Sequence, residues 1–381
     1  MGIYVVSYVI ITFSFVLLAN KRFKISGRPL IIDSSYNGKY EGQMKLFIVF
    51  SCALLICIVG LRSEYQGIDL HNSLGTGYFY VYDIVCGDTV ADIFRYFGVK
   101  RYANFEIGFV LFNKLISTLS KEHWILLFAT SLISIAPVGY YISVNSQNPW
   151  LSFMLYMSFP FFSTAYFSAI RQGIAIGIVV ISYEFVKRKK LLPFLLTIAL
   201  AVTFHKSSIV CIIAYPIYHA KISKRASLIG GLAVLAVIYI ARFPLFMVLS
   251  RTLRETSEID SNGAVNFFLL LTMVYALCTV FGNERDRELC GLRNLFWLAC
   301  ASQAFAGLYS TAGRITWYFL PPLLVLIPKL LAEAKIKERQ LLKPLSWGVG
   351  VMAILLGLYY LRYDSIAKAY PYIPFWLQGG V

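Results

Sequence analysis

The chain has 381 residues, of which 58% are hydrophobic and only 14% are charged. A soluble domain carries roughly 25% charged residues, so this composition excludes a soluble globular protein, a disordered chain and a disulfide scaffold. The net charge of +16 does not indicate nucleic-acid binding, because the Lys and Arg residues stand in loops between apolar blocks. These blocks are about 16–20 residues long, enough to cross a hydrocarbon core of roughly 30 Å. The sequence therefore predicts an all-α, polytopic integral membrane protein.

Twelve membrane spans are expected within a single transmembrane domain, residues 1–381, which places both termini on one side. Residues 191–219 lie between the basic runs 187–190 and 221–225. A single helix there would be roughly 43 Å long at ~1.5 Å per residue, so we expect a hairpin that turns near His205 and leaves both basic runs in the cytoplasm. The expected spans are residues 3–20, 44–61, 123–143, 150–169, 171–187, 190–204, 206–220, 226–241, 264–282, 294–310, 315–332 and 345–361.

The apolar segment 105–120 is an exception, because it contains Glu106, Asn113 and Lys114. If it crossed the membrane, every later segment would be reversed and the basic runs would lie outside. We therefore expect an amphipathic or re-entrant helix at the outer face. Other expected features of that face are an outer loop over about 62–104, a second outer segment over 242–263 with an amphipathic helix, and an aromatic interfacial tail over 370–376.

Neither a metal site nor a disulfide framework is expected. The seven cysteines form no CxxC pair, and most of them lie inside apolar blocks. The histidines His71, His123 and His219 show no metal-ligand spacing, and motifs of metallohydrolases and nucleotide-binding enzymes are absent from the sequence. The expectation is therefore a protein without metal, cofactor or nucleic-acid partner.

Ionisable residues at the outer ends of the spans are the functional candidates, because charges next to lipid are costly unless they serve a purpose. Arg171 stands beside Gln172 between two apolar blocks, and its planar guanidinium suits a phosphate or a carboxylate. Arg314 has a similar place and precedes Trp317 and Tyr318, whose aromatic faces could stack on sugar rings. The alternative interpretation is that each arginine only anchors its helix at the interface.

Three further candidates could take a proton from a sugar hydroxyl. His205 stands at the expected hairpin tip, where a neutral imidazole could act as a general base or simply form part of a capping turn. Asp69 follows Arg62 in the outer loop, and Glu106 opens an apolar helix. The alternative for Asp69 is an acid in a solvated loop. The alternative for Glu106 is a favourable interaction with the dipole of the helix that it precedes. Arg62 is a further candidate for substrate binding.

These groups, in this order, resemble the EpsG family of bacterial exopolysaccharide and O-antigen polymerases, which are Wzy-like. The resemblance covers roughly residues 40–330, and after Asp69 the chain reads Leu70-His71-Asn72 where the family often has a Gly-Thr-Asp-Thr run. The matching pieces are Gly67-Ile68-Asp69, Phe105-Glu106-Ile107-Gly108-Phe109, Ile170-Arg171-Gln172-Gly173-Ile174-Ala175, Phe204-His205-Lys206-Ser207-Ser208 and Arg314-Ile315-Thr316-Trp317-Tyr318-Phe319.

The resemblance implies a GT-C-like enzyme that joins oligosaccharide repeat units carried on undecaprenyl diphosphate, at the outer face of the bacterial cytoplasmic membrane. Arg171 and Arg314 would stabilise the diphosphate leaving group without a metal, and His205, ahead of Glu106 and Asp69, would accept the proton. Expected partners are the lipid-linked oligosaccharide, the bilayer, a flippase and a chain-length regulator.

Other functional classes stay open at this point. They are a transporter or flippase of lipid-linked oligosaccharide, a membrane O-acyltransferase and a glycan ligase. A transporter is expected to line a cavity near the membrane midplane with polar residues, whereas here the candidates gather toward one face. This distribution favours an enzyme, while a ligase would share both substrate and chemistry with a polymerase.

Overall fold

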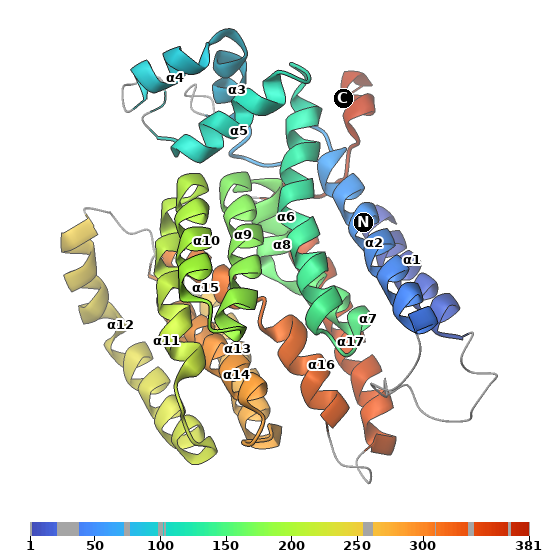
Figure 1. The fold of residues 1–381 in the computed structure, drawn as a ribbon, viewed down its shortest axis with the longest axis vertical. Helices are drawn as coiled ribbons and strands as arrows, with labels where there is room; N and C mark the ends of the chain where they lie inside the picture. The colour runs from blue at the N-terminus through green and yellow to red at the C-terminus, as the bar shows by residue number, and fades with distance from the viewer. Residues whose placement is uncertain are drawn as a thin grey trace.

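The chain forms a bundle of long helices that is capped at one end by shorter ones. The structure is a computed structural model, and it describes residues 2–20, 38–71, 77–97, 102, 104–253, 262–308, 310–333, 339–364 and 367–380. Within these ranges every regular element is a helix, apart from one isolated antiparallel bridge between Arg62 and Pro374. Figure 1 shows α3, α4 and α5 together across one end of the bundle, with the C-terminus at the same end. The prediction of an all-α fold is confirmed.

The helices of the first half include the capping elements. They are α1 (Gly2–Asn20), α2 (Gly38–Gly60), α3 (Tyr78–Gly87), α4 (Val90–Tyr96), α5 (Ile107–Ser117), α6 (His123–Asn145), α7 (Pro149–Ser158), α8 (Pro160–Phe167) and α9 (Ile170–Lys187). The second half completes the bundle. Its helices are α10 (Leu191–Phe204), η1 (Lys206–Ile213), α11 (Ala214–His219), η2 (Ala226–Gly230), α12 (Gly231–Leu253), α13 (Asn262–Phe281), α14 (Arg287–Gln303), α15 (Ser310–Phe319), α16 (Leu323–Glu333), α17 (Arg339–Tyr363) and η3 (Phe375–Gly380).

Several helices are long and apolar enough to cross a membrane. Among the described residues there are five, or six if the bent pair α15–α16 is one span, compared with the twelve spans expected. The two helices of that pair meet at 48°, on either side of Pro321 and Pro322. Proline removes a backbone donor and clashes with the preceding turn, which accounts for the bend. The five are Gly42–Gly60, His123–Asn145, Ala226–Met247, Ala264–Phe281 and Leu345–Tyr363, and together they indicate a multi-pass membrane protein.

Two further expected spans are interrupted. In place of one helix over 150–169, α7 ends before Phe159, which is extended (φ −75°, ψ 141°), and α8 begins at Pro160. A residue that precedes proline is disfavoured in the α conformation, which explains this break. In place of one helix over 206–220, a 3₁₀ helix, η1, leads into α11.

The expected outer segments also differ in detail. The loop over 62–104 contains α3 and α4, and α5 is an 11-residue helix, too short to cross the bilayer at ~1.5 Å per residue. In the segment 242–263, α12 continues through Pro244 to Leu253 in place of a separate amphipathic helix. Residues 254–261, like the basic segment 21–37, lie outside the described residues.

The hairpin predicted near His205 is present. At its far end, Nε2 of His219 lies 3.0 Å from the backbone oxygen of Val186, next to the basic run 187–190. The runs 187–190 and 221–225 therefore stand at the same end of the bundle, opposite α3, α4 and α5 (Figure 1). Ion pairs gather at this end: Lys187–Glu288, Lys329–Glu288 at 2.7 Å and Lys329–Asp286 at 2.8 Å.

A compact apolar cluster attaches the cap, which consists of α3, α4 and α5, to the bundle. It joins α3 and α5 to the first turns of α6 and α9, and it is distinct from the main core between the long helices. This attachment fixes the start of α5 next to the start of α9. The members from the bundle are Leu126, Leu127, Ile170 and Ile174, and the members from the cap include Tyr78, Phe79, Val81, Tyr82, Phe109, Val110 and Phe112.

Candidate functional site

Arg171, the second residue of α9, is the centre of a polar cluster under the cap. Its Nη1 forms an ion pair with the carboxylate of Glu106 and donates to the backbone oxygen of Asn104 at 2.9 Å. Its guanidinium carbon lies 4.8 Å from the ring centroid of Phe105 and 5.4 Å from that of Tyr78. Such cation–π contacts are stabilising and orient the planar group. The charge is thus held firmly, with the side chain 18% exposed.

Glu106 connects three parts of the chain. It precedes α5 as the N-cap residue, and its side chain is only 8% exposed. Its Oε2 pairs with Arg171, while its Oε1 accepts the backbone N–H of Lys206 at 3.1 Å and lies 3.7 Å from Nδ1 of His205. One carboxylate therefore ties α5 to α9 and to the tip of the α10–η1 hairpin. The same acid contacts both the candidate anion-binding group and the candidate base.

The position of Glu106 depends on a close approach of α5 to α10. A Cβ atom added at Gly108 would lie 2.2 Å from Oγ1 of Thr203 and 2.7 Å from its backbone oxygen. Both distances are far below van der Waals contact, and a backbone atom cannot turn aside. Glycine at this place is what allows the first turn of α5 to rest on the last turn of α10, next to His205.

His205 lies in the turn between α10 and η1, in an extended conformation (φ −155°, ψ 116°). Its Nδ1 is buried and forms no hydrogen bond within the described residues. Burial lowers the pKa of His205 below its usual 6.5, and the charges of Arg171 and Arg314 lower it further, although Glu106 raises it. The imidazole is therefore neutral at pH 7 and able to accept a proton.

The start of α15 is joined to the same cluster. Gln172, which is 1% exposed, donates from Nε2 to the backbone oxygen of Arg314 at 2.8 Å. Tyr318 is fully buried, and its hydroxyl shares a 3.0 Å hydrogen bond with Oγ of Ser207 at the hairpin tip. Arg314 is partly exposed, and its charge is felt at His205. The fold thus brings together Glu106, Arg171, Gln172, His205, Arg314 and Tyr318, all of which were sequence candidates.

Arg62 does not join this cluster. It is fully buried, and it donates hydrogen bonds to the backbone oxygens of Val59, of Gln66 at 3.2 Å and of Phe167 at 2.9 Å. These carbonyls belong to the end of α2, the following loop and the end of α8. The structure therefore shows Arg62 bracing the backbone, and its contact with substrate stays a prediction.

The two remaining candidates lie beside the cluster or behind it. Asp69 is half-buried, its backbone N–H donates to Oγ of Ser168 at 3.2 Å, and its charge acts on Tyr78. Trp317 is 8% exposed and belongs to the main apolar core. Sequence reasoning also missed Tyr78, Phe105 and Ser207. Phe105 and Ser207 stand within recognised motifs, whereas Tyr78 carried no signal among the many aromatic residues of its loop.

The cluster combines cationic groups with a neutral base. Arg171 is paired with Glu106, and the positive charge of Arg314 is felt at His205, whose imidazole is neutral. Guanidinium groups of this kind can attract an anionic group, with the imidazole close by. The fold and the site together define a multi-pass helical membrane protein with a polar cluster around Arg171 and Glu106 at one end of its bundle.

The chain belongs to the EpsG family, whose sequence profile matches residues 45–375, and this family is linked to exopolysaccharide biosynthesis. The predicted resemblance is thus confirmed. No curated protein and no solved structure shows a significant match to the chain.

Proposed function

We propose that this protein is a polymerase that joins undecaprenyl-diphosphate-linked oligosaccharide repeat units at the outer face of the bacterial cytoplasmic membrane. The observation that carries the proposal is the single carboxylate of Glu106, which pairs with Arg171 and lies 3.7 Å from Nδ1 of His205. A glycosyl transfer from a lipid diphosphate needs a cation to stabilise the leaving anion and a base to accept the proton. Arg171 supplies the first and His205 the second. Membership of a family linked to exopolysaccharide biosynthesis agrees with this substrate class.

The arginines stabilise the leaving group. As the bond between the anomeric carbon and the diphosphate oxygen breaks, its electron pair stays on the lipid diphosphate, whose charge increases. Arg171 has five N–H donors, and its contacts with Glu106, Asn104 and Tyr78 are made by Nε and Nη1. Donors held in place before the reaction lower the barrier because no reorganisation is needed when the charge develops. Arg314 adds a second positive charge, so the scheme uses no metal. The sugar donor is the lipid diphosphate itself, so the scheme uses no nucleotide sugar either.

His205 takes the proton. The hydroxyl oxygen of the acceptor sugar attacks the anomeric carbon, and its proton passes to the neutral imidazole. Glu106, 3.7 Å from Nδ1, orients the ring and stabilises the imidazolium that forms, as carboxylates do in other base–acid pairs. Glu106 itself is less suited to be the base, because Arg171 and the backbone N–H of Lys206 already engage its oxygens.

We further propose that the bundle crosses the bilayer twelve times, as one GT-C-like transmembrane domain. The pairs α7–α8, η1–α11 and α15–α16 would each form one interrupted span, in addition to the continuous apolar helices. The basic runs 187–190 and 221–225 share one end of the bundle, and the positive-inside rule assigns that end to the cytoplasm. The cluster around Arg171 then faces outward, where lipid-linked repeat units are presented.

The test replaces Arg171 and Arg314 singly with lysine in cells that make the polymer. Lysine keeps the charge but loses the planar fork, so a fall in polymerisation rate of about 10²–10³ is expected, with accumulation of lipid-linked single repeat units. The matched control is Arg188→Lys, because that side chain is 56% exposed at the opposite end of the bundle. Normal chain-length ladders in both variants, at protein levels equal to the control, would refute the proposal. Normal ladders with failed transfer to the final lipid acceptor would favour a ligase instead.

A further inference from the structure

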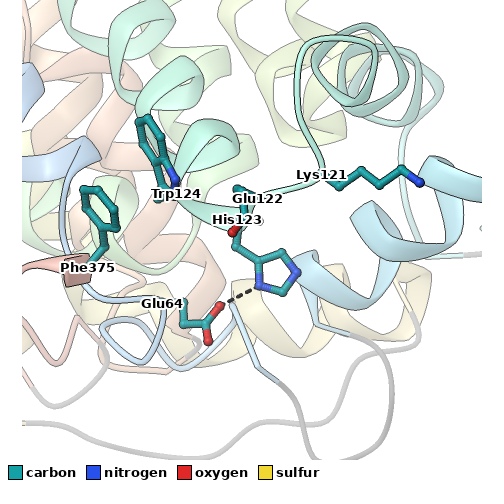
Figure 2. A pocket seen from close by; sticks show the side chains of 6 residues that line it. All are labelled: Glu64, Lys121, Glu122, His123, Trp124 and Phe375. Atoms are coloured by element: carbon teal, nitrogen blue, oxygen red, sulfur yellow. Dashed lines mark hydrogen bonds and ion pairs between the residues drawn. The ribbon is translucent and has the colours of Figure 1, made fainter. Parts of the chain in front are cut away.

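A second polar cluster lies at the capped end, formed by Glu64, His71 and His123. The first two residues belong to the loop after α2, and His123 is the first residue of α6. Nδ1 of His123 lies 2.5 Å from Oε2 of Glu64, and Nε2 of His71 lies 3.8 Å from the same oxygen. All three ligand atoms lie within 4.8 Å of one another. Figure 2 shows the side chains of Glu64 and His123 pointing toward each other.

The second ring nitrogen of His123 has the partner that a metal ligand needs. Its Nε2 lies 2.8 Å from Oδ1 of Asp83 on α3. Histidines that bind metals usually donate their other N–H to a carboxylate or carbonyl, which fixes the tautomer and strengthens the ligand. Aromatic contacts hold both rings as well: His123 stacks on Phe79 at 4.2 Å, and His71 stacks on Tyr65 at 5.2 Å. The donor atoms are therefore positioned before any ligand arrives.

An open cavity adjoins the cluster. Its volume is about 310 Å³, and Glu64 and His123 form part of its wall (Figure 2). Its other lining residues are Lys121, Glu122, Trp124 and Phe375. The cavity gives a bound ion room for a water molecule or an anionic oxygen as an additional ligand. Glu64, Asp83 and Glu122 outweigh the single Lys121 in charge, which favours a cation here.

We propose that Glu64, His71 and His123 bind a divalent transition-metal ion of the zinc class, with one coordination position open to this cavity. Two imidazoles and one carboxylate form a mixed nitrogen and oxygen donor set, which suits zinc and its neighbours rather than the all-oxygen shells of calcium and magnesium. Metal–ligand bonds of ~2.0–2.2 Å place two ligands of one ion within about 4.3 Å of each other, so small side-chain movements complete the site.

The consequence is a crosslink within the cap. The ion joins the loop after α2 to α6 and, through Asp83, to α3. Phe79, which stacks on His123, is next in sequence to Tyr78, which contacts Arg171. The two histidines are 52 positions apart in sequence (123 − 71), so ligand spacing gave no indication of the site. This inference does not rest on the proposed polymerase function.

The experiment measures metal binding to the full chain in detergent micelles, purified with a tag that contains no histidine and stripped with a chelator. Calorimetric titration with Zn²⁺, and absorption spectra with Co²⁺, are expected to show one equivalent bound per chain. His71→Gln and Glu64→Gln should each weaken the Zn²⁺ affinity at least tenfold, and Asp83→Asn by roughly 10–100-fold. The control is His219→Gln, because His219 lies at the opposite end, next to Val186.

The His71 variant keeps the test decisive, because that side chain is 43% exposed and its replacement leaves the core intact. Size-exclusion elution at the wild-type volume verifies folding. Absence of stoichiometric Zn²⁺ binding to the wild type would overturn the proposal. So would binding that is unaffected by both His71→Gln and Glu64→Gln, or Mg²⁺ affinity equal to that of Zn²⁺. The assay contains no glycan substrate, so its result is separate from that of the polymerase test.

Discussion

The ion pair between Glu106 and Arg171 is expected to be a strong energetic link between the cap and the bundle. The two side chains are 8% and 18% exposed, so the pair lies much nearer the buried limit than the exposed one. Exposed pairs contribute about 0.2–1 kcal/mol, whereas removal of one member of a buried pair costs about 3–5 kcal/mol. We expect Glu106→Gln and Arg171→Gln each to lower the free energy of unfolding by about 2–4 kcal/mol, because each leaves a charge unpaired.

The double variant separates the pair from its surroundings. Because neither charge remains in the double variant, its free energy of unfolding should fall little further than that of one single variant. This corresponds to a coupling energy of about 2 kcal/mol or more between the two residues. The assay is unfolding by SDS in mixed micelles, followed by tryptophan fluorescence. The comparison is a cycle on Arg188 and Glu184, an i,i+4 pair at 3.6 Å with Arg188 56% exposed, for which about 0.3–0.5 kcal/mol is expected. Additive losses at Glu106 and Arg171 would refute the reasoning.

Three further predictions follow from the site and the topology. Gly108→Val should displace the start of α5 and lower polymerisation activity, whereas Gly42→Val, with open space around it, should not. Equal polymer chain-length ladders from the two variants would contradict the argument that Gly108 is needed for the close approach of α5 to α10. The acidic limb of the activity profile should have its midpoint below pH 6.5, because the lowered pKa of His205 keeps the base neutral until the pH falls through that pKa; a midpoint at or above 6.5 counts against His205. With the accessible native cysteines replaced by serine, a cysteine at Lys121 should react with an impermeant thiol reagent in intact cells and one at Lys189 should not, and the reverse pattern would invert the topology.

Much of the architecture was predictable because lipid imposes simple rules on sequence. Apolar blocks must form helices, since backbone groups find no water to bond in the membrane. The basic runs 187–190 and 221–225 could be placed at one end of the bundle, and the contact between His219 and Val186 is in agreement. A proline in the sequence also marks the break between α7 and α8 at Pro160. The predicted span over 150–169 nevertheless ran through this proline as one helix. The number of spans stays a prediction beyond the five or six apolar candidates.

The candidate site was predicted in part for a similar reason. Arg171, His205 and Glu106 are conspicuous because polar groups at the ends of apolar blocks are costly, so their presence signals a purpose. Their mutual distances could not be deduced, because they depend on how α5 crosses α10 at Gly108. Arg62 shows the converse, since its sequence position resembled that of the others, yet the fold surrounds it with backbone oxygens.

The sequence by itself determined that this protein is helical, lies in a membrane and carries cationic candidates near one face, because hydrophobicity and charge are local properties of residues. Tertiary structure alone decided which of those side chains meet. A carboxylate can link Arg171 to His205, and His71 can reach Glu64 beside His123, only once distant helix ends are packed together. Contacts of this kind arise from the packing of whole helices, and no spacing along the chain encodes them.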